Sequence, residues 1–365
     1  MTNEGADSPI EPERLQEWLA EVADPSIHSI AVHRLGGGHS SGAWRIDAMT
    51  GGGPRSMVLK APGEPSVVYR RSAAREAHVI DGLHRAGAPV PEILAIDDGT
   101  GAIGRPCFAM THVPGRGVAD VGANGYHDDE ELRAGGPELQ RAVWESFHDA
   151  LAAMHCVDPR DVPAASTVTG ANQGGVRDVL DYWRRALLDA MDGLGGNGGL
   201  GGNGGLGEKE GAPAPRQLAA LQWLGEHVPP GADDAPAVCL GDARLVNGIV
   251  DGDTVRALVD FEVAYVGNPL ADVGYSLMLE DRHRRAVAEP LALPSAEETW
   301  QRWSRASGRP LEHLAYWTAF SMTIICITAT RAMLQWGMAG ATVDTDNPMV
   351  TDWLALIEVA SKESP

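Results

Sequence analysis

A polar stretch in the second half of the chain places the tightest constraint on its fold. Residues 240–247 read Leu-Gly-Asp-Ala-Arg-Leu-Val-Asn, and the apolar run 237–239 before them predicts a buried strand that delivers Asp242 onto a loop. An Asp-Gly turn signal between two short apolar runs then predicts a β-hairpin that folds Asp260 back towards Asn247. A carboxylate, an amide oxygen and a second carboxylate are therefore expected to converge, which suits the handling of a metal-bound triphosphate.

The amino-terminal third carries the signals of a nucleotide site. The glycine-rich residues 36–42 lie between two short strand candidates, and such a loop lets backbone N–H groups approach phosphate oxygens, although alone it is an ordinary turn signal. A strand over 57–60 ends in Lys60, and a helix over 72–86 carries Glu76 in its first turns. A strand lysine and a helix glutamate at this spacing match the pattern in which the carboxylate holds the lysine against the α- and β-phosphates.

The order of these signals predicts an α+β chain of two lobes. Strand candidates at 30–32, 43–46, 57–60, 91–96 and 108–110 give a small antiparallel sheet. Strand chemistry changes to turn chemistry directly after residue 110, so the lobe boundary is expected there. The expected organisation is a helical extension over 1–27, a nucleotide-binding lobe over 28–111 and a larger, mainly helical lobe over 112–365.

Helical periodicity fills the larger lobe and the extension. The expected helices are 12–22, 139–155, 176–191, 216–227, 296–307, 311–337 and 350–361. A six-residue tandem repeat, Leu-Gly-Gly-Asn-Gly-Gly, predicts a flexible insertion over 193–215 because glycine loses much backbone entropy on ordering. Residues 314–330 lack charge, but they are short for a membrane span and rich in threonine, so a buried helix is expected.

Composition excludes some partners. With 50 acidic and 29 basic residues the net charge is −21, which opposes binding to nucleic acid or to an anionic membrane. The same charge favours a cationic or metal-chelated partner, or it is a solubility feature of the host proteome. The absence of a C-x-x-C pair and of a secretory signal predicts buried reduced thiols in a cytoplasmic protein. The four cysteines are Cys107, Cys156, Cys239 and Cys326.

Taken in order, these features resemble the aminoglycoside phosphotransferase family, the small-molecule kinases of protein-kinase-like fold that include the choline kinases. The family motif H-G-D-x-x-x-x-N matches from Gly241 to Asn247, and the following D-[FW]-E matches at residues 260–262. Residues 267–274 are similar to the family's G-D-P-x-x-D-[LV]-G segment, and 87–91 to its linker before the fourth strand. The resemblance runs in consistent order over residues 28–335, and it implies a protein-kinase-like bilobal fold.

The resemblance implies transfer of the γ-phosphoryl group of ATP to a hydroxyl of a small molecule, with GTP left open as the donor. Asp242 would be the base or orienting group for that hydroxyl, and Asn247 and Asp260 would hold Mg²⁺. Lys60 would contact the α- and β-phosphates and Glu76 would orient it. The other nucleotide-binding residues implied are Gly38, His39, Ser40 and Ser41 over the phosphates, and Met110, Thr111 and Val113 around adenine.

The acceptor and the level of activity stay open. An aminoglycoside or another cationic acceptor would suit the acidic chain, with Glu280, Asp281 or Glu312 as candidate lining residues, but amino alcohols, sugars, macrolides and hydroxyacyl thioesters are alternatives. Leu240 stands where the family has a histidine that braces the loop. A leucine can brace a loop by packing, so an active enzyme is expected, with a nucleotide-binding pseudokinase as the alternative. A protein kinase is disfavoured because no Ala-Pro-Glu segment follows Asp260.

Overall fold

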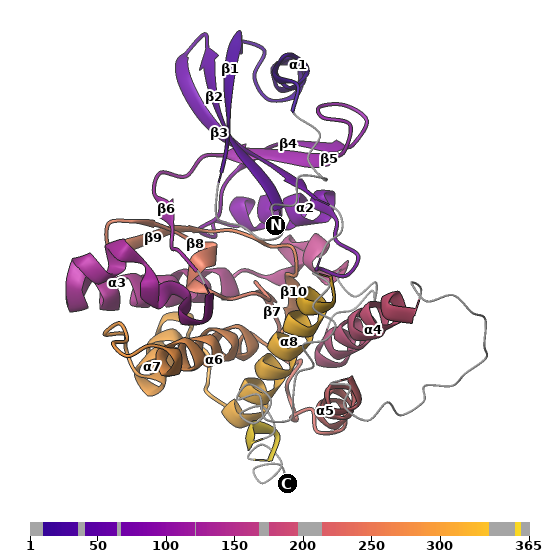
Figure 1. The fold of residues 1–365 in the computed structure, drawn as a ribbon, viewed down its shortest axis with the longest axis vertical. Helices are drawn as coiled ribbons and strands as arrows, with labels where there is room; N and C mark the ends of the chain where they lie inside the picture. Colours follow the sequence, from indigo (N-terminus) through magenta and orange to yellow (C-terminus); the bar gives the residue numbers. More distant parts are fainter. Residues whose placement is uncertain are drawn as a thin grey trace.

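The computed structural model describes residues 10–35, 41–63, 67–120, 122–167, 175–195, 214–335 and 355–358. A twisted sheet with two helices forms one part of the molecule, and a larger, mainly helical part lies beneath it (Figure 1). Short strands lie between the two parts, and the motif residues lie on the segments that join these strands.

The upper sheet has the five strands that the sequence predicts. Its antiparallel order is β1-β2-β3-β5-β4. The strands are β1 Ser29–Arg34, β2 Ser41–Thr50, β3 Gly53–Pro62, β4 Ile93–Asp98 and β5 Pro106–Thr111. Side chains alternate across β3, so Leu59 belongs to the apolar cluster under helix α1 (Pro12–Val22), while the next residue, Lys60, points to the opposite face.

Helix α2 (Ala73–Arg85) covers that opposite face. Ser72 caps it by accepting a hydrogen bond from the backbone N–H of Arg75 at 3.2 Å. Ala77, Ile80 and Leu83 are buried against the sheet. The same packing brings Glu76, which is 0% exposed, beneath β3.

Helices make up most of the lower part. They are α3 Glu130–His155, α4 Val176–Gly195, α5 Ala214–Glu226, α6 Leu270–Ala286, α7 Ala296–Ser307 and α8 Leu314–Gln335. Helix α8 lies centrally and contacts α4, α5 and α6 (Figure 1), so its apolar side chains are buried as the sequence predicts. Among the described residues, no helix combines the length and apolarity needed to cross a membrane.

Two small sheets flank the motif residues, which lie on the segments between their strands. Strand β7 (Ala237–Cys239) pairs with β10 (Tyr265–Gly267), and β8 (Gly248–Asp251) and β9 (Thr254–Leu258) form the predicted hairpin. Strand β6 (Arg116–Gly117) adds to β8. The sequence did not predict β6 or β10, because strands of two or three residues are too short to show an alternating pattern.

Some boundaries differ from the predictions. Helix α3 begins at Glu130 instead of residue 139, with Asp129 as its cap, and a kink at Gly136 (φ 72°) divides it just before Pro137. The periodicity seen in the sequence belongs to the part after that kink. The ends of the predicted insertion over 193–215 are helical, since α4 runs to Gly195 and α5 starts at Ala214. Its residues 196–213, and all but 355–358 of the predicted helix 350–361, lie outside the described residues.

The prediction of four buried cysteines is wrong at one position. Cys107, Cys239 and Cys326 are buried free thiols, but Cys156 is exposed. Cys156 is the residue that caps the carboxyl end of α3, where the helix reaches the surface, and its apolar neighbours in the sequence belong to the buried face of that helix.

Candidate active site

The loop after β7 presents Asp242. Gly241 has φ 82°, and a Cβ at this position would lie 2.4 Å from the carbonyl oxygen of Val263, so only glycine fits. Asn247 then holds the loop closed, because its Nδ2 donates to the carbonyl oxygen of Asp242 at 2.8 Å and to Asp242 Oδ2 at 3.1 Å. The aspartate and asparagine of the motif are therefore in direct contact.

Asp272 fixes the start of this loop from helix α6. Its carboxylate accepts the backbone N–H of Leu240 at 2.6 Å and that of Gly241 at 3.0 Å. His155 Nε2 lies 3.0 Å from Asp272 Oδ2, and Trp303 donates to His155 Nδ1 at 3.0 Å, so Nε2 carries the imidazole proton and donates it to Asp272. Asp272, which lies in the segment 267–274, therefore fixes the backbone of the loop.

The same region contains a geometric candidate for a metal centre. Ligand atoms of His155, Cys239 and Asp272 lie within 4.8 Å of one another, and all three residues are buried. However, both imidazole nitrogens of His155 are occupied by hydrogen bonds. Burial, followed by the nearby charge of Asp272, raises the pKa of Cys239 well above its usual value, so the thiol stays protonated. The group is a hydrogen-bonded support for the loop.

Lys60 joins the two parts of the molecule. Its Nζ donates to Glu76 Oε1 at 2.5 Å and to Asp260 Oδ1 at 2.7 Å. Burial works against the charged amine, but the carboxylates of Asp260 and Glu76 outweigh it and raise the pKa of Lys60 above its usual value. The predicted Lys60–Glu76 pair is present, and the contact with Asp260 extends it to the second motif.

Asp260 occupies a strained position that suits a ligand site. It has φ 69°, which a non-glycine residue adopts at a cost of about 1 kcal/mol or more. The adjacent Val259 N–H donates to the Asn247 carbonyl oxygen at 2.8 Å, which places the two predicted metal ligands side by side. Lys60 uses Oδ1 of Asp260, and the amide nitrogen of Asn247 is used by Asp242. The oxygens that remain, Asp260 Oδ2 and Asn247 Oδ1, are the donor type that Mg²⁺ prefers.

Three residues beside Asp242 went unnoticed in the sequence. Arg244 donates two hydrogen bonds to the Asp242 carboxylate, from Nε to Oδ1 at 2.8 Å and from NH2 to Oδ2 at 2.7 Å. Its NH1 donates a third hydrogen bond to Asp120 Oδ2 at 3.0 Å. Tyr275 on α6 also hydrogen-bonds to Asp242. Arg244 could have been noticed as the one cation inside the motif, whereas Asp120 and Tyr275 carry no local signal.

Two arginines were also missed in the sequence, Arg71 just before α2 and Arg75 in its first turn. Arg71 forms an ion pair with Glu262, the last residue of the second motif. Arg75 donates to the carbonyl oxygens of Glu262 and Ala264, and burial lowers the pKa of Arg75 to about 10. Helix α2 therefore contacts this loop directly through Arg75 and indirectly through Glu76, which binds Lys60, and Arg71 adds an ion pair from just before the helix.

The residues expected around adenine lie at the end of β5. Met110 is buried, and Val113 is half-buried. The Thr111 N–H donates to Glu92 O at 2.9 Å, so this amide is occupied within the sheet and does not face a ligand.

The glycine loop is only partly described. Ser41 is the first residue of β2 rather than part of the loop. Gly38, His39 and Ser40 lie outside the described residues.

Two of the three acidic residues considered for a cationic acceptor have protein partners, and the third, Glu312, is exposed at the surface. Glu280 is 5% exposed and accepts hydrogen bonds from Tyr126 at 2.6 Å and Arg284 at 3.0 Å. Asp281 pairs with Arg285 on the same helix. Glu280 is therefore closed to an acceptor, whereas Asp281 is 45% exposed in a surface ion pair.

Sequence relatives carry this region within longer chains. The family model of the phosphotransferase enzyme family matches residues 31–309. Acyl-CoA dehydrogenase family member 11 of Gallus gallus is 28% identical over 250 residues, which are 68% of this chain and 28% of that protein. Acyl-CoA dehydrogenase family member 10 of Mus musculus is 25% identical over 281 residues, 73% of this chain and 23% of that protein. The chain thus spans roughly a quarter of the length of these relatives.

Solved structures share the fold. A candidate aminoglycoside phosphotransferase from Ralstonia eutropha JMP134 superposes with a TM-score of 0.66 at 19% identity, covering 98% of this chain and 100% of that one. A thermostable mutant of aminoglycoside phosphotransferase APH(4)-Ia, in a ternary complex with AMP-PNP and hygromycin B, gives a TM-score of 0.54 at 16% identity, covering 95% and 97%. The predicted protein-kinase-like fold is confirmed. Because the family model covers most of the sequence, the chain belongs to the phosphotransferase enzyme family.

Proposed function

We propose that this chain transfers the γ-phosphoryl group of ATP to a hydroxyl of a small molecule. The observation that carries the proposal is a continuous line of contacts from one part of the molecule to the other. Glu76 binds Lys60, Lys60 binds Asp260, and the backbone beside Asp260 binds Asn247, which in turn binds Asp242. A phosphate-binding cation, two metal ligands and a base therefore meet in one place, as phosphoryl transfer requires.

Asp242 is the group that would receive the acceptor. Its carboxylate would orient the hydroxyl and accept its proton as the new bond to phosphorus forms. The backbone clamp from Asp272 to residues 240 and 241 keeps this carboxylate in place without a motif histidine. Lys60, held by Glu76, would bind the α- and β-phosphates.

Asn247 and Asp260 would hold Mg²⁺. When bound, this ion would neutralise charge on the triphosphate. Lys60 uses Oδ1 of Asp260, and Asp242 uses the amide nitrogen of Asn247, so Asp260 Oδ2 and Asn247 Oδ1 are the oxygens that would bind the ion.

Adenine would lie against the segment after β5. Since the Thr111 N–H is occupied by Glu92, the amide of Val113 and the carbonyl oxygen of Thr111 are the better candidates to pair with the base, with Met110 behind it. The backbone of residues 38–41 would cover the phosphates. The same groups would accept a guanine base only with a different hydrogen-bond pattern, and a titration with Mg-GTP beside Mg-ATP would distinguish the two donors.

The acceptor is open between two chemical classes. Solved structures of the fold include a complex with the aminoglycoside hygromycin B. The curated relatives are named for acyl-CoA dehydrogenases, which favours a hydroxylated acyl-CoA as a second candidate. The protein would be incubated with Mg-ATP and with aminoglycosides, amino alcohols, sugars and hydroxyacyl-CoA compounds, and ADP release and acceptor mass would be measured.

The expected result is ADP release that depends on one acceptor class, with a mass gain of one phosphoryl group in that acceptor. Retained nucleotide binding with no transfer to any acceptor would instead favour a nucleotide-binding pseudokinase, the alternative raised by Leu240. The absence of both binding and transfer would reject the phosphotransferase proposal.

A further inference from the structure

Arg244 covers the carboxylate that the proposed reaction needs. The guanidinium makes two hydrogen bonds to Asp242 and one to Asp120, and its neighbouring backbone is held by a tight turn in which Arg244 N–H donates to Asp242 O at 2.8 Å. In this arrangement Asp242 accepts two hydrogen bonds from Arg244, one from Asn247 and one from Tyr275, which together match the roughly four lone-pair sites of a carboxylate. An acceptor hydroxyl can use Asp242 as a base only if one of these donors leaves.

Arg244 is the donor best able to leave. Asp242 keeps two other partners, Asn247 at 3.1 Å and Tyr275, whose positions are set by the hairpin and by α6. The side chain of Arg244 is 33% exposed, whereas that of Asp242 is 18% exposed, so the guanidinium lies on the open side of the pair. Asp120 would keep the guanidinium nearby after it releases Asp242.

The destination of the guanidinium follows from its chemistry. A planar guanidinium binds phosphate oxygens with the same two-pronged geometry as a carboxylate. Lys60, the other cation of the cluster, is buried and engaged by Glu76 and Asp260 on the far side of the line of contacts. The Arg244 guanidinium, which lies beside Asp242, would therefore neutralise negative charge on the transferred phosphoryl group.

We propose that Arg244 is a second phosphoryl-binding cation, which holds Asp242 before substrate binds and turns to the transferred phosphoryl group during the reaction. This inference rests on the proposed function. The bond between the γ-phosphorus and the bridging oxygen breaks and leaves its electron pair on ADP, while the acceptor oxygen bonds to phosphorus and its proton passes to Asp242. Arg244 thus exposes the base and neutralises the phosphoryl oxygens in one movement.

Calorimetric titration with ADP and with AMP-PNP, each with Mg²⁺, separates this role from a structural one. For Arg244→Gln the Kd of AMP-PNP should rise about tenfold, a free-energy loss of about 1.4 kcal/mol, because a charge-assisted contact to the γ-phosphate is lost. The Kd of ADP should stay within about twofold, since that contact is absent in ADP. Arg244→Lys should lie between wild type and Arg244→Gln, because lysine binds phosphate only as a point charge.

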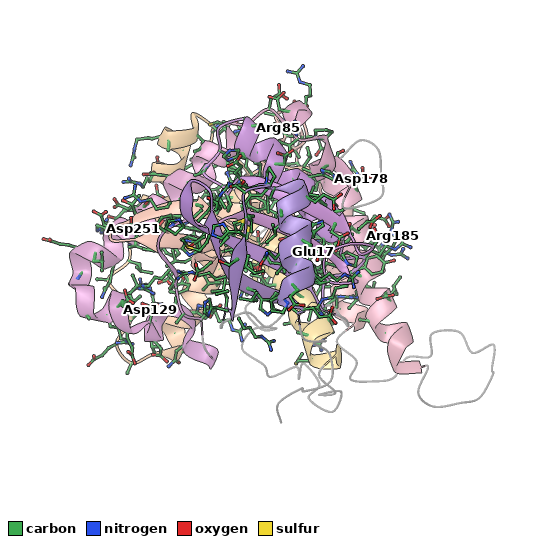
Figure 2. All side chains as sticks on the ribbon, turned by 90° about the horizontal axis from the view of Figure 1, so that it is seen from above. Glu17, Arg85, Asp129, Asp178, Arg185 and Asp251 are labelled. Carbon is green, nitrogen blue, oxygen red and sulfur yellow. The ribbon has the colours of Figure 1, made fainter. Side chains whose placement is uncertain are left out.

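Arg256 provides a matched control. It pairs with Asp251 at 3.2 Å on the hairpin, both side chains are about half exposed, and Asp251 lies at the periphery of the molecule (Figure 2). Arg256→Gln should leave both dissociation constants at the wild-type values. In the transfer assay Arg244→Gln should lower kcat by about 10²-fold or more, as expected when one donor to a developing charge is removed, with a smaller change in the acceptor KM.

Equal weakening of ADP and AMP-PNP by Arg244→Gln, or no weakening of either, would overturn the role of Arg244 while leaving the proposed function intact. Failure of the wild-type protein to bind either nucleotide would overturn both. If Arg244→Gln does not fold, the comparison is made with Arg244→Lys, for which an unchanged ratio of the two dissociation constants would refute the inference.

Discussion

Leu240 is the residue at which the chain departs from its family motif. Its side chain is fully buried in the main apolar core, and its N–H is held by Asp272 together with that of Gly241. The loop is therefore braced from the backbone, and the side chain adds packing. This supports an active loop without a histidine at position 240.

We predict that Leu240→His brings no gain in turnover. A histidine at this fully buried apolar position has no polar partner provided for it and should lower the free energy of unfolding by about 1–3 kcal/mol. Steady-state kinetics and urea unfolding check the two effects, with Leu240→Met as the volume-conserving control. A gain in kcat of about tenfold or more would show that the present loop is impaired.

At the scale of elements, helix α2 is tied to the Asp260 loop by more than the predicted ion pair. Arg75 donates hydrogen bonds to two carbonyl oxygens of that loop. Arg71, just before the helix, forms an ion pair with Glu262. These contacts make the position of α2 and the geometry of the proposed metal ligands depend on each other.

Arg75→Met tests this dependence. Loss of the guanidinium leaves buried carbonyl oxygens unsatisfied, which should lower the free energy of unfolding by about 1–3 kcal/mol and weaken Mg-AMP-PNP binding. Arg85 on the same helix is 71% exposed, pairs with Asp81 and lies at the surface (Figure 2), so Arg85→Met is the control and should change little. If Arg75→Met leaves the affinity for Mg-AMP-PNP unchanged, the geometry of the proposed metal ligands does not depend on the position of α2.

Helix α3 carries a buried histidine that predicts a pH dependence of stability. Burial lowers the pKa of His148 to about 4, so the imidazole is neutral in the folded protein, with Nδ1 donating to Trp144 O at 2.9 Å. The unfolded chain takes up a proton near pH 6.5, so this contribution to stability is fully present above pH 6.5 and is lost as the pH falls towards 4.

Between pH 7.5 and pH 5.0 the wild-type protein should lose about 2 kcal/mol more unfolding free energy than His148→Gln. Urea unfolding at the two pH values measures the difference. His227→Gln removes the same kind of bond, Nδ1 to Trp223 O at 2.8 Å, from a half-buried site and should keep the wild-type loss. An equal loss in all three proteins would contradict the assignment to His148.

Much of the element scale could be predicted from the sequence, because apolar periodicity and turn signals are local. The five strands of the sheet, α1, α7 and the β8–β9 hairpin follow from such patterns, as does the Lys60–Glu76 pair. The strands β6 and β10 could not be predicted, since pairing partners far along the chain create them. The same holds for Asp120, whose part in the cluster depends on the fold bringing it to Arg244.

The two parts of the molecule, the upper sheet with its helix and the larger helical part, contact each other at the proposed site. Lys60, Arg75 and the backbone bond from Leu258 N–H to Pro89 O at 2.8 Å connect the upper sheet and its helix to the hairpin region below. A nucleotide bound at this junction would contact both parts. Preferential binding to the folded chain would then raise the unfolding free energy of the entire molecule.

The central claim is that Asp242 promotes phosphoryl transfer from Mg-ATP to a hydroxyl. The most direct test is to measure phosphorylated acceptor by mass spectrometry for wild type and Asp242→Asn, at nucleotide concentrations that saturate both proteins. We expect transfer by the wild type and a loss of about 10²–10⁴-fold in Asp242→Asn, with Mg-AMP-PNP binding retained. Transfer by Asp242→Asn at a rate close to that of the wild type would contradict it.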